Sequence, residues 1–462
     1  MRRRTVLSAA AVGAAAAAGC GGVLPGGDDG VEDDRADDRD ADERDADERD
    51  PDDEEGVPRG DEFETVVDLV EEGADPTGEE SIRPFLDEFA DDDTLLYLSE
   101  GRFYVDDIWW EPDLTGFGIV GEDATIVPPA DEATRLLNVD GGRDALVAGL
   151  TFDYTESVGG RALQVVVDDG LEVIDVSVIG RLEEGPGPIR VDITDPDGEG
   201  TVERLAFPDG GTAESIATGL YVGNSNQGDL TVRDCHIEGF PDNGLYGDPP
   251  AGTVNVDGGY FANNGIASVR VRGGSIVRDA HVRCDDAPRD FPNMRGIRAT
   301  DYEPREESEP VVVEGCRVEM LDVTHSDGAI VLGTGLAALE IRDTHVRVDA
   351  DGVYGVRITT PDRVVAEGAS PPRVSCADLT VTGRAEGAAA IRISDRDGGE
   401  IRDLLVYQSG ADRDGIQFHR SNDNTVTDSV IEVRGEPIKF VEATAQVERT
   451  ISTRSPPFPF GG

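Results

Sequence analysis

The sequence predicts an all-β protein, a single-stranded, right-handed parallel β-helix of about 11–13 coils. Three observations support this fold class. A short apolar pattern recurs eleven times along the chain. Second strands lie between the copies, with no helical periodicity of the kind that crossover helices of an α/β sheet would require. Only 5% of the residues are aromatic, which suits a narrow core of Val, Ile, Leu and Ala.

Each copy of the pattern contains two apolar residues five positions apart, usually with Asp or Gly at the third position. The copies begin at Val147, Val173, Val202, Val232, Val256, Val277, Val313, Ile341, Val374, Ile401 and Val426. The steps between them vary from 21 to 36 residues. Such variation is typical of a solenoid whose insertions fall in loops.

The third position of each copy is predicted to be a one-residue bend between two short strands. Aspartate, whose short side chain can bond its own backbone, holds it at Asp175, Asp234, Asp279, Asp343, Asp403 and Asp428. The next residue is small or apolar and is expected to face inward, forming a ladder of Leu150, Val176, Leu205, Cys235, Ala280, Cys316, Thr344 and Leu404. Cys235 and Cys316 would then lie three coils apart, about 14 Å at a strand spacing of about 4.8 Å. That distance is too long for a disulfide, so free buried thiols are expected.

A second strand follows in most coils, introduced by Gly and then an apolar residue, as in Gly219-Leu220 and Gly355-Val356. The residue after the apolar one is expected to point outward. Stacked coil on coil, these residues form a column of Tyr221, Tyr246, Ala267, Arg298, Ile330, Arg357, Arg392, Gln417 and Lys439. The column therefore carries aromatic side chains toward one end and cations toward the other.

Residues 1–20 are typical of a twin-arginine lipoprotein signal. Arg2, Arg3 and Arg4 precede an Ala-rich stretch that is too short to span a bilayer. The stretch ends at Ala-Ala-Gly followed by Cys20. We expect Cys20 to carry a lipid that anchors the protein to the outer face of the cell membrane; the alternative is cleavage and release.

The remaining chain divides into three parts. Residues 21–62 are mostly Asp, Glu, Arg and Ala from position 28 on, and are expected to be a disordered acidic tether. The β-helix domain is expected over 63–450, and a C-terminal tail over 451–462.

The chain is strongly acidic, with a formal net charge of −56. The leader has three arginines, and residues 28–62 have 20 acids and five arginines, which leaves −44 on residues 63–462. Lysine occurs once, at Lys439. Extreme acidity with almost no lysine resembles haloarchaeal proteins, in which molar salt screens the repulsion. This charge excludes nucleic acid as an expected partner.

Residues 63–105 resemble the opening segment of pectate-lyase-superfamily β-helix proteins. The resemblance rests on Phe63 to Val70, on Gly73-Ala74-Asp75-Pro76-Thr77-Gly78, and on Ile82, Phe85-Leu86 and Phe89. It implies a short N-terminal capping helix, followed by a first strand and turn at Leu95 to Val105. The superfamily includes lyases, hydrolases, epimerases, tailspikes and non-catalytic surface proteins, so the resemblance implies a fold and no single activity. The Asn-Thr-Asp and Gly-His-Gly signatures of polygalacturonases are absent, and we find no copy of the pectate-lyase calcium aspartates.

The outward column is the candidate binding site. Sugar rings stack on aromatic faces, and arginine pairs with carboxylates or sulfates. The expected partner is therefore a uronate-rich or sulfated polysaccharide. Acids at the lip of the same face are Asp242, Asp327, Asp351 and Asp414, and His419 points the same way.

Two functions remain open from the sequence. In the first, the protein acts on an anionic polysaccharide at the cell surface, either by binding it alone or by also cleaving it as a lyase or a glycoside hydrolase. Asp327, Asp351, Asp414 and His419 are then the catalytic candidates, with Arg357 and Arg392 beside them. In the second, the protein is a structural or adhesive surface module without chemistry. The oligomeric state is not indicated.

Metal binding is weakly indicated. His236, His281 and His345 share one outward position but lie at least two coils apart, about 10 Å, which is too far to share a metal. Acidic pairs such as Asp285-Asp286 could hold Ca²⁺. Trp109-Trp110 is expected either to cap the core or to stack on sugar.

Overall fold

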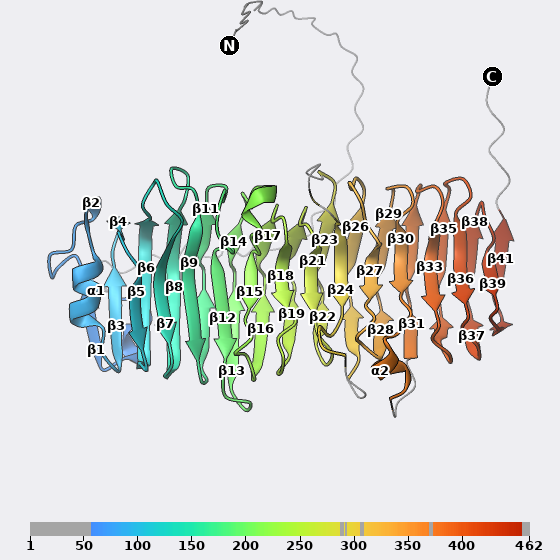
Figure 1. Cartoon of the computed structure of the whole chain (residues 1–462), viewed down its shortest axis with the longest axis horizontal. Coiled ribbons are helices and arrows are strands. Elements are labelled where there is room, and N and C mark those ends of the chain that lie inside the picture. The colour runs from blue at the N-terminus through green and yellow to red at the C-terminus, as the bar shows by residue number, and fades with distance from the viewer. Residues whose placement is uncertain (1–56, 287–290, 292, 305–308, 369–372, 455–462) are drawn as a thin grey trace, which may run out of the picture. The chain divides into compact units, whose positions relative to one another are not determined.

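The structure is a computed structural model that describes residues 57–286, 291, 293–304, 309–368 and 373–454. These residues belong to one compact unit. It is a right-handed parallel β-helix whose coils stack side by side in Figure 1. The predicted fold class is confirmed. The predicted signal at 1–20, with Cys20, lies outside the described residues, as do 21–56 of the tether and 455–462 of the tail.

A 13-stranded parallel sheet takes one strand from each of thirteen coils. Its strands are β5 (Trp109–Pro112), β7 (Thr134–Asp140), β9 (Gly160–Val167), β12 (Ile189–Ile193), β15 (Leu220–Val222), β18 (Asn243–Gly247), β21 (Ala267–Val271), β24 (Arg295–Ala299), β27 (Gly328–Leu332), β30 (Tyr354–Ile358), β33 (Ala389–Ser394), β36 (Asp414–His419) and β39 (Ile438–Val441). These are the predicted second strands. The coil of β1 (Thr65–Asp68) and β2 (Thr77–Ser81) and the coil of β40 (Ala445–Glu448) and β41 (Ile451–Arg454) contribute no strand to this sheet, so the described coils slightly exceed the predicted 11–13.

A 28-stranded parallel sheet forms the rest of each coil, mostly as two short strands joined by a bend. Its strands are β1 (Thr65–Asp68), β2 (Thr77–Ser81), β3 (Thr94–Leu98), β4 (Gly101–Tyr104), β6 (Thr115–Val127), β8 (Arg143–Asp153), β10 (Leu171–Ile174), β11 (Ser177–Ile179), β13 (Glu199–Glu203), β14 (Ala206–Phe207), β16 (Asp229–Arg233), β17 (His236–Glu238), β19 (Val254–Asp257), β20 (Tyr260–Ala262), β22 (Ile276–Arg278), β23 (His281–Cys284), β25 (Val311–Glu314), β26 (Arg317–Met320), β28 (Ala338–Arg342), β29 (His345–Val348), β31 (Arg373–Ala377), β32 (Thr380–Gly383), β34 (Glu400–Arg402), β35 (Leu405–Gln408), β37 (Asn424–Thr427), β38 (Val430–Val433), β40 (Ala445–Glu448) and β41 (Ile451–Arg454). The helices are α1 (Arg83–Phe89), α2 (Arg363–Ala366), and the 3-10 turns η1 (Gly60–Glu62) and η2 (Ala213–Ser215).

The bend between the paired strands is a left-handed residue, as the aspartate pattern predicts. All six predicted aspartates have φ between 48° and 54°. Aspartate and asparagine adopt this conformation more readily than other side chains except glycine. Glycine takes the same position in other coils, for example Gly315 with φ 65°. Because Arg204 and Arg449 also occupy it, with φ 52° and 47°, the bend tolerates a longer side chain where that chain pairs with the aspartate of the coil below.

The repeat is in register in ten of its eleven copies, and one start was placed wrongly. Ile341 pairs with Cys376, not with Val374. The bend of that coil is Asp378, with φ 51°, so the apolar pair is Cys376 and Val381. The error arose because cysteine was not counted as the first apolar residue of a copy.

The inward ladder after the bend is confirmed, since its eight predicted members are all at most 2% exposed. Cys235, Cys284, Cys316 and Cys376 are free and buried. Polar members of the ladder form hydrogen bonds with nearby backbone. The Thr344 hydroxyl donates to the Arg342 carbonyl at 2.8 Å, and the Cys235 thiol donates to the Arg233 carbonyl at 3.3 Å. A thiol or hydroxyl can therefore lie in this core without an unpaired donor.

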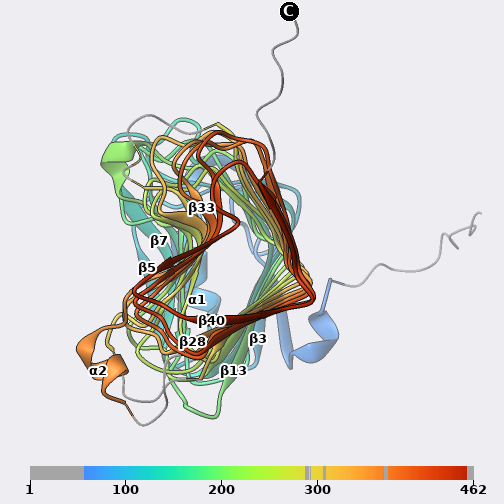
Figure 2. The ribbon, with the colours of Figure 1, turned by 90° about the vertical axis from the view of Figure 1, so that its right-hand side faces the viewer.

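The predicted capping helix is α1. It contacts β3 and β5 and buries Leu86. Seen along the coil axis, it lies within the outline of the coils (Figure 2). The strand at Leu95 is not the first, however, because β1 precedes it and pairs with it. Trp109 is fully buried beside Phe117, whereas Trp110 is 45% exposed, so only Trp109 completes the core.

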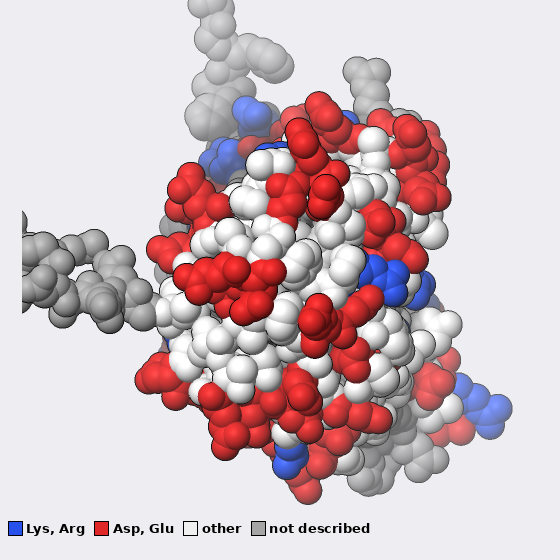
Figure 3. Space-filling view, turned by 90° about the vertical axis from the view of Figure 1, so that its left-hand side faces the viewer, with Lys and Arg blue, Asp and Glu red and all other residues white. Residues whose placement is uncertain are grey.

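The β-helix continues past residue 450, because β41 pairs with β38. Aspartate and glutamate are spread over the end that carries α1, with few basic side chains between them (Figure 3). Within the part of the chain that the structure describes, no helix is long and apolar enough to cross a membrane.

Candidate functional site

The outward column of the 13-stranded sheet is the candidate site, and the strand register corrects two of its predicted members. Tyr246 pairs with Arg270 rather than Ala267, and Arg298 pairs with Val331 rather than Ile330. β21 and β27 are buried along their whole length, so no in–out alternation marked the correct residue in the sequence. We define the outer column as Trp110, Asn138, Gln164, Arg190, Tyr221, Tyr246, Arg270, Arg298, Val331, Arg357, Arg392, Gln417 and Lys439.

The introducing glycines are explained by the core beneath this sheet. A Cβ on Gly219 would lie 2.5 Å from Ile237 Cγ2, and one on Gly415 would lie 2.6 Å from Ile431 Cγ2. Only a residue without a side chain fits there. The strands that carry the outer column therefore lie close against the core. This contact fixes how far the side chains that follow each glycine extend from the sheet.

An aromatic platform forms where β15, β18 and β21 adjoin. The rings of Tyr221 and Tyr246 are 5.3 Å apart, and the Arg270 guanidinium lies 4.4 Å from the centroid of the Tyr246 ring. Tyr221 and Tyr246 are half-buried, whereas Arg270 is only 8% exposed. Such a surface can stack a sugar ring and hold an anion beside it.

Arg298 lies one coil beyond the platform and has no hydrogen-bond or ion-pair partner among the described residues. Burial, together with the neighbouring charges of Arg270 and Arg295, lowers its pKa to about 10. Most of the described arginines are ion-paired to carboxylates, for example Arg342 to Glu314 at 2.8 Å. An unpaired guanidinium in so acidic a protein is therefore an open site for an anion.

A second such group lies on the other side of the tyrosines. Arg161 is 5% exposed, and its Nη1 has no hydrogen-bond partner within the described ranges. Burial, with Arg135 and Arg190 nearby, lowers its pKa to about 10. Arg190 itself is paired, because its Nε donates to Asp192 at 3.0 Å. The two unpaired guanidinium groups flank the aromatic platform.

The predicted catalytic residue Asp327 is ion-paired. Arg295 Nε lies 3.0 Å from Asp327 Oδ2, and Arg357 Nη1 lies 2.5 Å from Oδ1. Burial acts to raise the pKa of Asp327, but Arg295 and Arg357 outweigh it and hold that pKa below its usual range. Asp327 is a fixed anion between two arginines.

Asp414 is held in a similar way. The Glu436 amide and Gln417 each donate to it at 2.8 Å, and Lys439 Nζ lies 3.0 Å away. These contacts lower the pKa of Asp414 despite its burial. Of the other candidates, Asp351 accepts from the Glu386 amide at 2.8 Å, and His419 Nε2 lies 3.3 Å from Arg420 Nη1.

The structure does not bring the predicted acids together in one cluster. Asp327 precedes β27 and Asp414 begins β36, three coils apart, which is about 14 Å. Arg392 donates to the Tyr354 hydroxyl at 3.0 Å and lies beside Arg357 on the next strand. The C-terminal half of the outer column is thus a row of separate, mostly paired polar groups.

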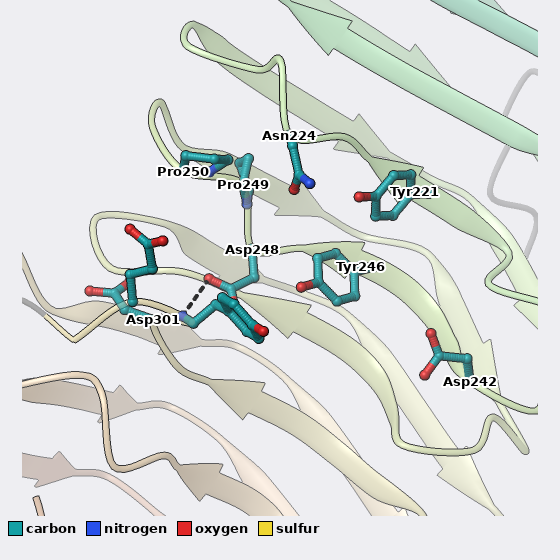
Figure 4. A pocket seen from close by; sticks show the side chains of 10 residues that line it. Tyr221, Asn224, Asp242, Tyr246, Asp248, Pro249, Pro250 and Asp301 are labelled. Atoms are coloured by element: carbon teal, nitrogen blue, oxygen red, sulfur yellow. Dashed lines mark hydrogen bonds between the residues drawn. The ribbon is translucent and has the colours of Figure 1, made fainter. Parts of the chain in front are cut away.

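A pocket of about 540 Å³ opens beside the aromatic platform (Figure 4). It lies at the ends of β15, β18 and β24, and its lining residues are Tyr221, Asn224, Asp242, Tyr246, Asp248, Pro249, Pro250, Asp301, Tyr302 and Glu303. The sequence analysis did not single out Asp248 or Asp301. The one available signal was that each acid lies within two residues of the end of a second strand, β18 or β24.

Two buried carboxylates in this pocket have different surroundings. Asp248 Oδ2 accepts from Arg270 Nη2 at 2.6 Å, and Oδ1 accepts a long bond of 3.3 Å from the Tyr302 amide. Burial raises the pKa of Asp248 to about 6, even though Arg270 acts to lower it. Asp301 Oδ1 accepts from the Gly273 amide at 2.9 Å, whereas its buried Oδ2 has no partner in the described structure.

The histidine column lies on the 28-stranded sheet. Tyr260 separates His236 from His281, with ring centroids 5.1 and 5.2 Å apart, so the predicted two-coil spacing is correct. Asp285, where calcium was considered, is ion-paired to Arg283 at 2.6 Å. Over the described ranges, no group of three or more His, Cys, Asp or Glu residues could hold a metal ion.

No family model matches this chain, and no curated protein matches it. Solved structures do. The A-module of the mannuronan C-5 epimerase AlgE4 from Azotobacter vinelandii is 11% identical, with 84% of this chain and 100% of that chain covered and a TM-score of 0.47. The surface adhesin PfbA of Streptococcus pneumoniae is 11% identical, with 83% and 91% covered and a TM-score of 0.37. The Yersinia enterocolitica family 28 exopolygalacturonase is 10% identical, with 85% and 79% covered and a TM-score of 0.34. Because identities are near 10% and TM-scores are below 0.5, these likenesses carry no inference about activity.

Proposed function

We propose that the protein binds an anionic polysaccharide along the outer column of the 13-stranded sheet. The observation that carries this proposal is the unpaired guanidinium of Arg298 in a chain with a net charge of −56. A carboxylate or sulfate of the ligand would give that group the partner it lacks, by a charge-assisted hydrogen bond. Uronate-rich or sulfated polymers supply such anions at regular spacing.

The aromatic platform supports a sugar polymer over a simple anion. The Tyr221 and Tyr246 rings lie on adjacent coils, so a chain lying along the coil axis meets stacking surfaces first and then the cations of Arg270 and Arg298. Strong negative charge elsewhere on the surface repels polyanions. Binding should therefore be confined to this column.

The experiment is a calorimetric titration of the full chain with polygalacturonate, alginate, a sulfated galactan and a neutral glucan. We expect binding to the acidic polymers alone, weakening as salt rises. Arg298→Gln should weaken binding about tenfold, or about 1.4 kcal/mol. The matched control is Arg342→Gln on the 28-stranded sheet, which removes an ion-paired arginine and should bind as the wild type does. Equal affinity of Arg298→Gln and wild type would contradict the proposal.

A purely adhesive role is the second candidate, and one observation favours it. Asp327 and Asp414 are ion-paired to Arg357 and Lys439, so two of the four residues first considered as catalytic already have a cationic partner. Binding without bond cleavage at the C-terminal half of the column is consistent with this arrangement.

We further propose that the protein acts at the cell surface, anchored through a lipid on Cys20, in a cell whose salt is high. This rests on the sequence of residues 1–20 and on the acidity of the chain. Cys20→Ser should move the protein from the membrane fraction to the medium. Retention of the variant in membranes would contradict the anchor.

A further inference from the structure

The pocket beside the aromatic platform differs from the rest of the outer column. Its volume of about 540 Å³ falls within the range of about 300–1,000 Å³ that is usual for small-molecule sites. Tyr221 and Tyr246 form one wall, while Asp248 and Asp301 lie toward the other (Figure 4). A polymer bound on the tyrosines would therefore lie beside two carboxylates that line the same pocket.

Besides its acidic residues, this pocket contains a buried carboxylate oxygen that has no partner in the described structure. Asp301 is 5% exposed, and its Oδ2 has no hydrogen-bond partner among the described residues although the atom is buried. A buried carboxylate oxygen without a partner is costly and requires an explanation. A ligand hydroxyl or a water held against a ligand would supply the missing donor.

We propose that this pocket is a hydrolytic site in which Asp248 is the general acid and Asp301 the general base. Asp248 donates its proton to the glycosidic oxygen as the bond from that oxygen to the anomeric carbon breaks. A water molecule forms the new bond to that carbon and gives its proton to Asp301. One proton thus passes from solvent through Asp248 to the leaving hydroxyl, and another from water to Asp301 and back to solvent. The inference rests on the proposed function, because the same face must first hold the polymer.

The surroundings of each carboxylate fit its role. A general acid must hold its proton near neutral pH, and burial raises the pKa of Asp248 to about 6. Its Oδ1, which accepts only the long bond from the Tyr302 amide, is free to carry that proton. Asp301 is oriented through Oδ1 by the Gly273 amide, which leaves Oδ2 to accept a proton from water. Two carboxylates with distinct environments are the requirement for glycoside hydrolysis.

Neighbouring groups position the polymer rather than react. Arg270 fixes Asp248 and faces the Tyr246 ring. Arg298 lies on the next strand of the sheet and would bind the carboxylate of an adjacent uronate. We call both positioning residues, since each acts on the cleaved bond only through Asp248 or through the orientation of the substrate.

The test uses the full chain and whichever polyuronate binds it. New reducing ends and the ultraviolet absorbance of unsaturated uronate are followed together, and binding is measured separately by calorimetry. Wild type should release reducing ends without the absorbance. Asp248→Asn and Asp301→Asn should each lower the cleavage rate at least about a hundredfold and leave affinity within about twofold. The control is Asp257→Asn, at a partly exposed carboxylate on the 28-stranded sheet, and this variant should cleave normally.

Three results would overturn the inference: binding without any reducing ends, reducing ends accompanied by the absorbance, or normal cleavage by either pocket variant. None of these affects the proposed binding, whose failure would show in the calorimetry instead. If a variant fails to fold, the wild-type pH profile decides. Cleavage should fall as pH rises above about 6, because Asp248 loses its proton there, and a rate that keeps rising to pH 8 would contradict the assigned acid.

Discussion

At the scale of single residues, some charged side chains of this acidic protein contact several partners of opposite charge, whereas others have none among the described residues. Glu319 illustrates the first kind. It is 1% exposed and accepts from Arg317 at 2.8 Å, from Arg283 at 3.2 Å, and lies 2.9 Å from His281 Nε2. Burial acts to raise the pKa of Glu319, but the bonds from Arg317 and His281 outweigh it and lower that pKa to about 2. Arg298, in contrast, has no such partner among the described residues.

Replacing Glu319 with Gln should therefore destabilise the fold. We expect a loss of about 2 kcal/mol in the free energy of unfolding at pH 7, because the buried carboxylate gives up its charge-assisted hydrogen bonds from three partly exposed basic side chains. The folded pKa is lowered from 4.5 to about 2, so the stabilisation is complete above pH 4.5 and is lost as pH falls toward 2. Urea unfolding at pH 7 and pH 3 measures it. A difference between variant and wild type that does not shrink at pH 3 would show that charge is not the cause.

At the scale of the element, the left-handed bend sets the geometry of each coil. Where the bend is Gly315, an added Cβ would lie 2.1 Å from Asp279 Oδ1 of the preceding coil. The aspartate side chain thus occupies the space under the next coil's backbone. Aspartate and glycine suit this column because one supplies the side chain and the other accommodates it.

Gly315→Ala should destabilise the protein by about 3 kcal/mol, the sum of left-handed strain and the collision with Asp279. Gly352→Ala is the matched control. Gly352 has a similar φ of 72° but nothing lies within 4 Å of its added Cβ, so its loss should be about 1 kcal/mol. Thermal unfolding of both variants gives the comparison. Equal losses would mean that backbone strain alone accounts for the preference.

At the scale of the whole molecule, like-charge repulsion opposes folding at low salt. Residues 63–462 carry −44, and screening by salt weakens repulsion between exposed charges. Stability and polyanion binding should therefore respond to salt in opposite directions, since salt also screens the attraction of Arg298 for its ligand.

Raising sodium chloride from 0.1 M to 2 M should raise the melting temperature by more than about 5 °C at pH 7. The rise should be smaller at pH 4, where part of the carboxylates are protonated. Differential scanning calorimetry at the two pH values tests this. An equal rise at both pH values would mean that exclusion of salt from the protein surface, and not screening of carboxylate charges, raises the melting temperature.

The sequence by itself determined the fold, because a coil is specified locally. The bend aspartates, the apolar pair around them and the introducing glycines each act within a few residues, and they repeat. The buried free thiols followed from the same repeat, whereas the capping helix, found at Arg83–Phe89, was implied by the resemblance of residues 63–105 to pectate-lyase-superfamily proteins. Among the eleven repeat starts, only the one at Val374 was misplaced, by two residues.

The tertiary structure alone decided the site. Whether Arg270 or Ala267 joins the outer column depends on strand register. Because every residue of β21 is buried, its sequence shows no alternation of polar and apolar residues from which the register could be predicted. Asp248 and Asp301 lie 53 positions apart in sequence yet line one pocket, because loops of unequal length fold over the ends of stacked strands. The structure was also needed to show which charges are paired. In the sequence, Asp327 was one of several acids near the arginines of the column. Its contacts with Arg295 and Arg357 show that this carboxylate is already neutralised.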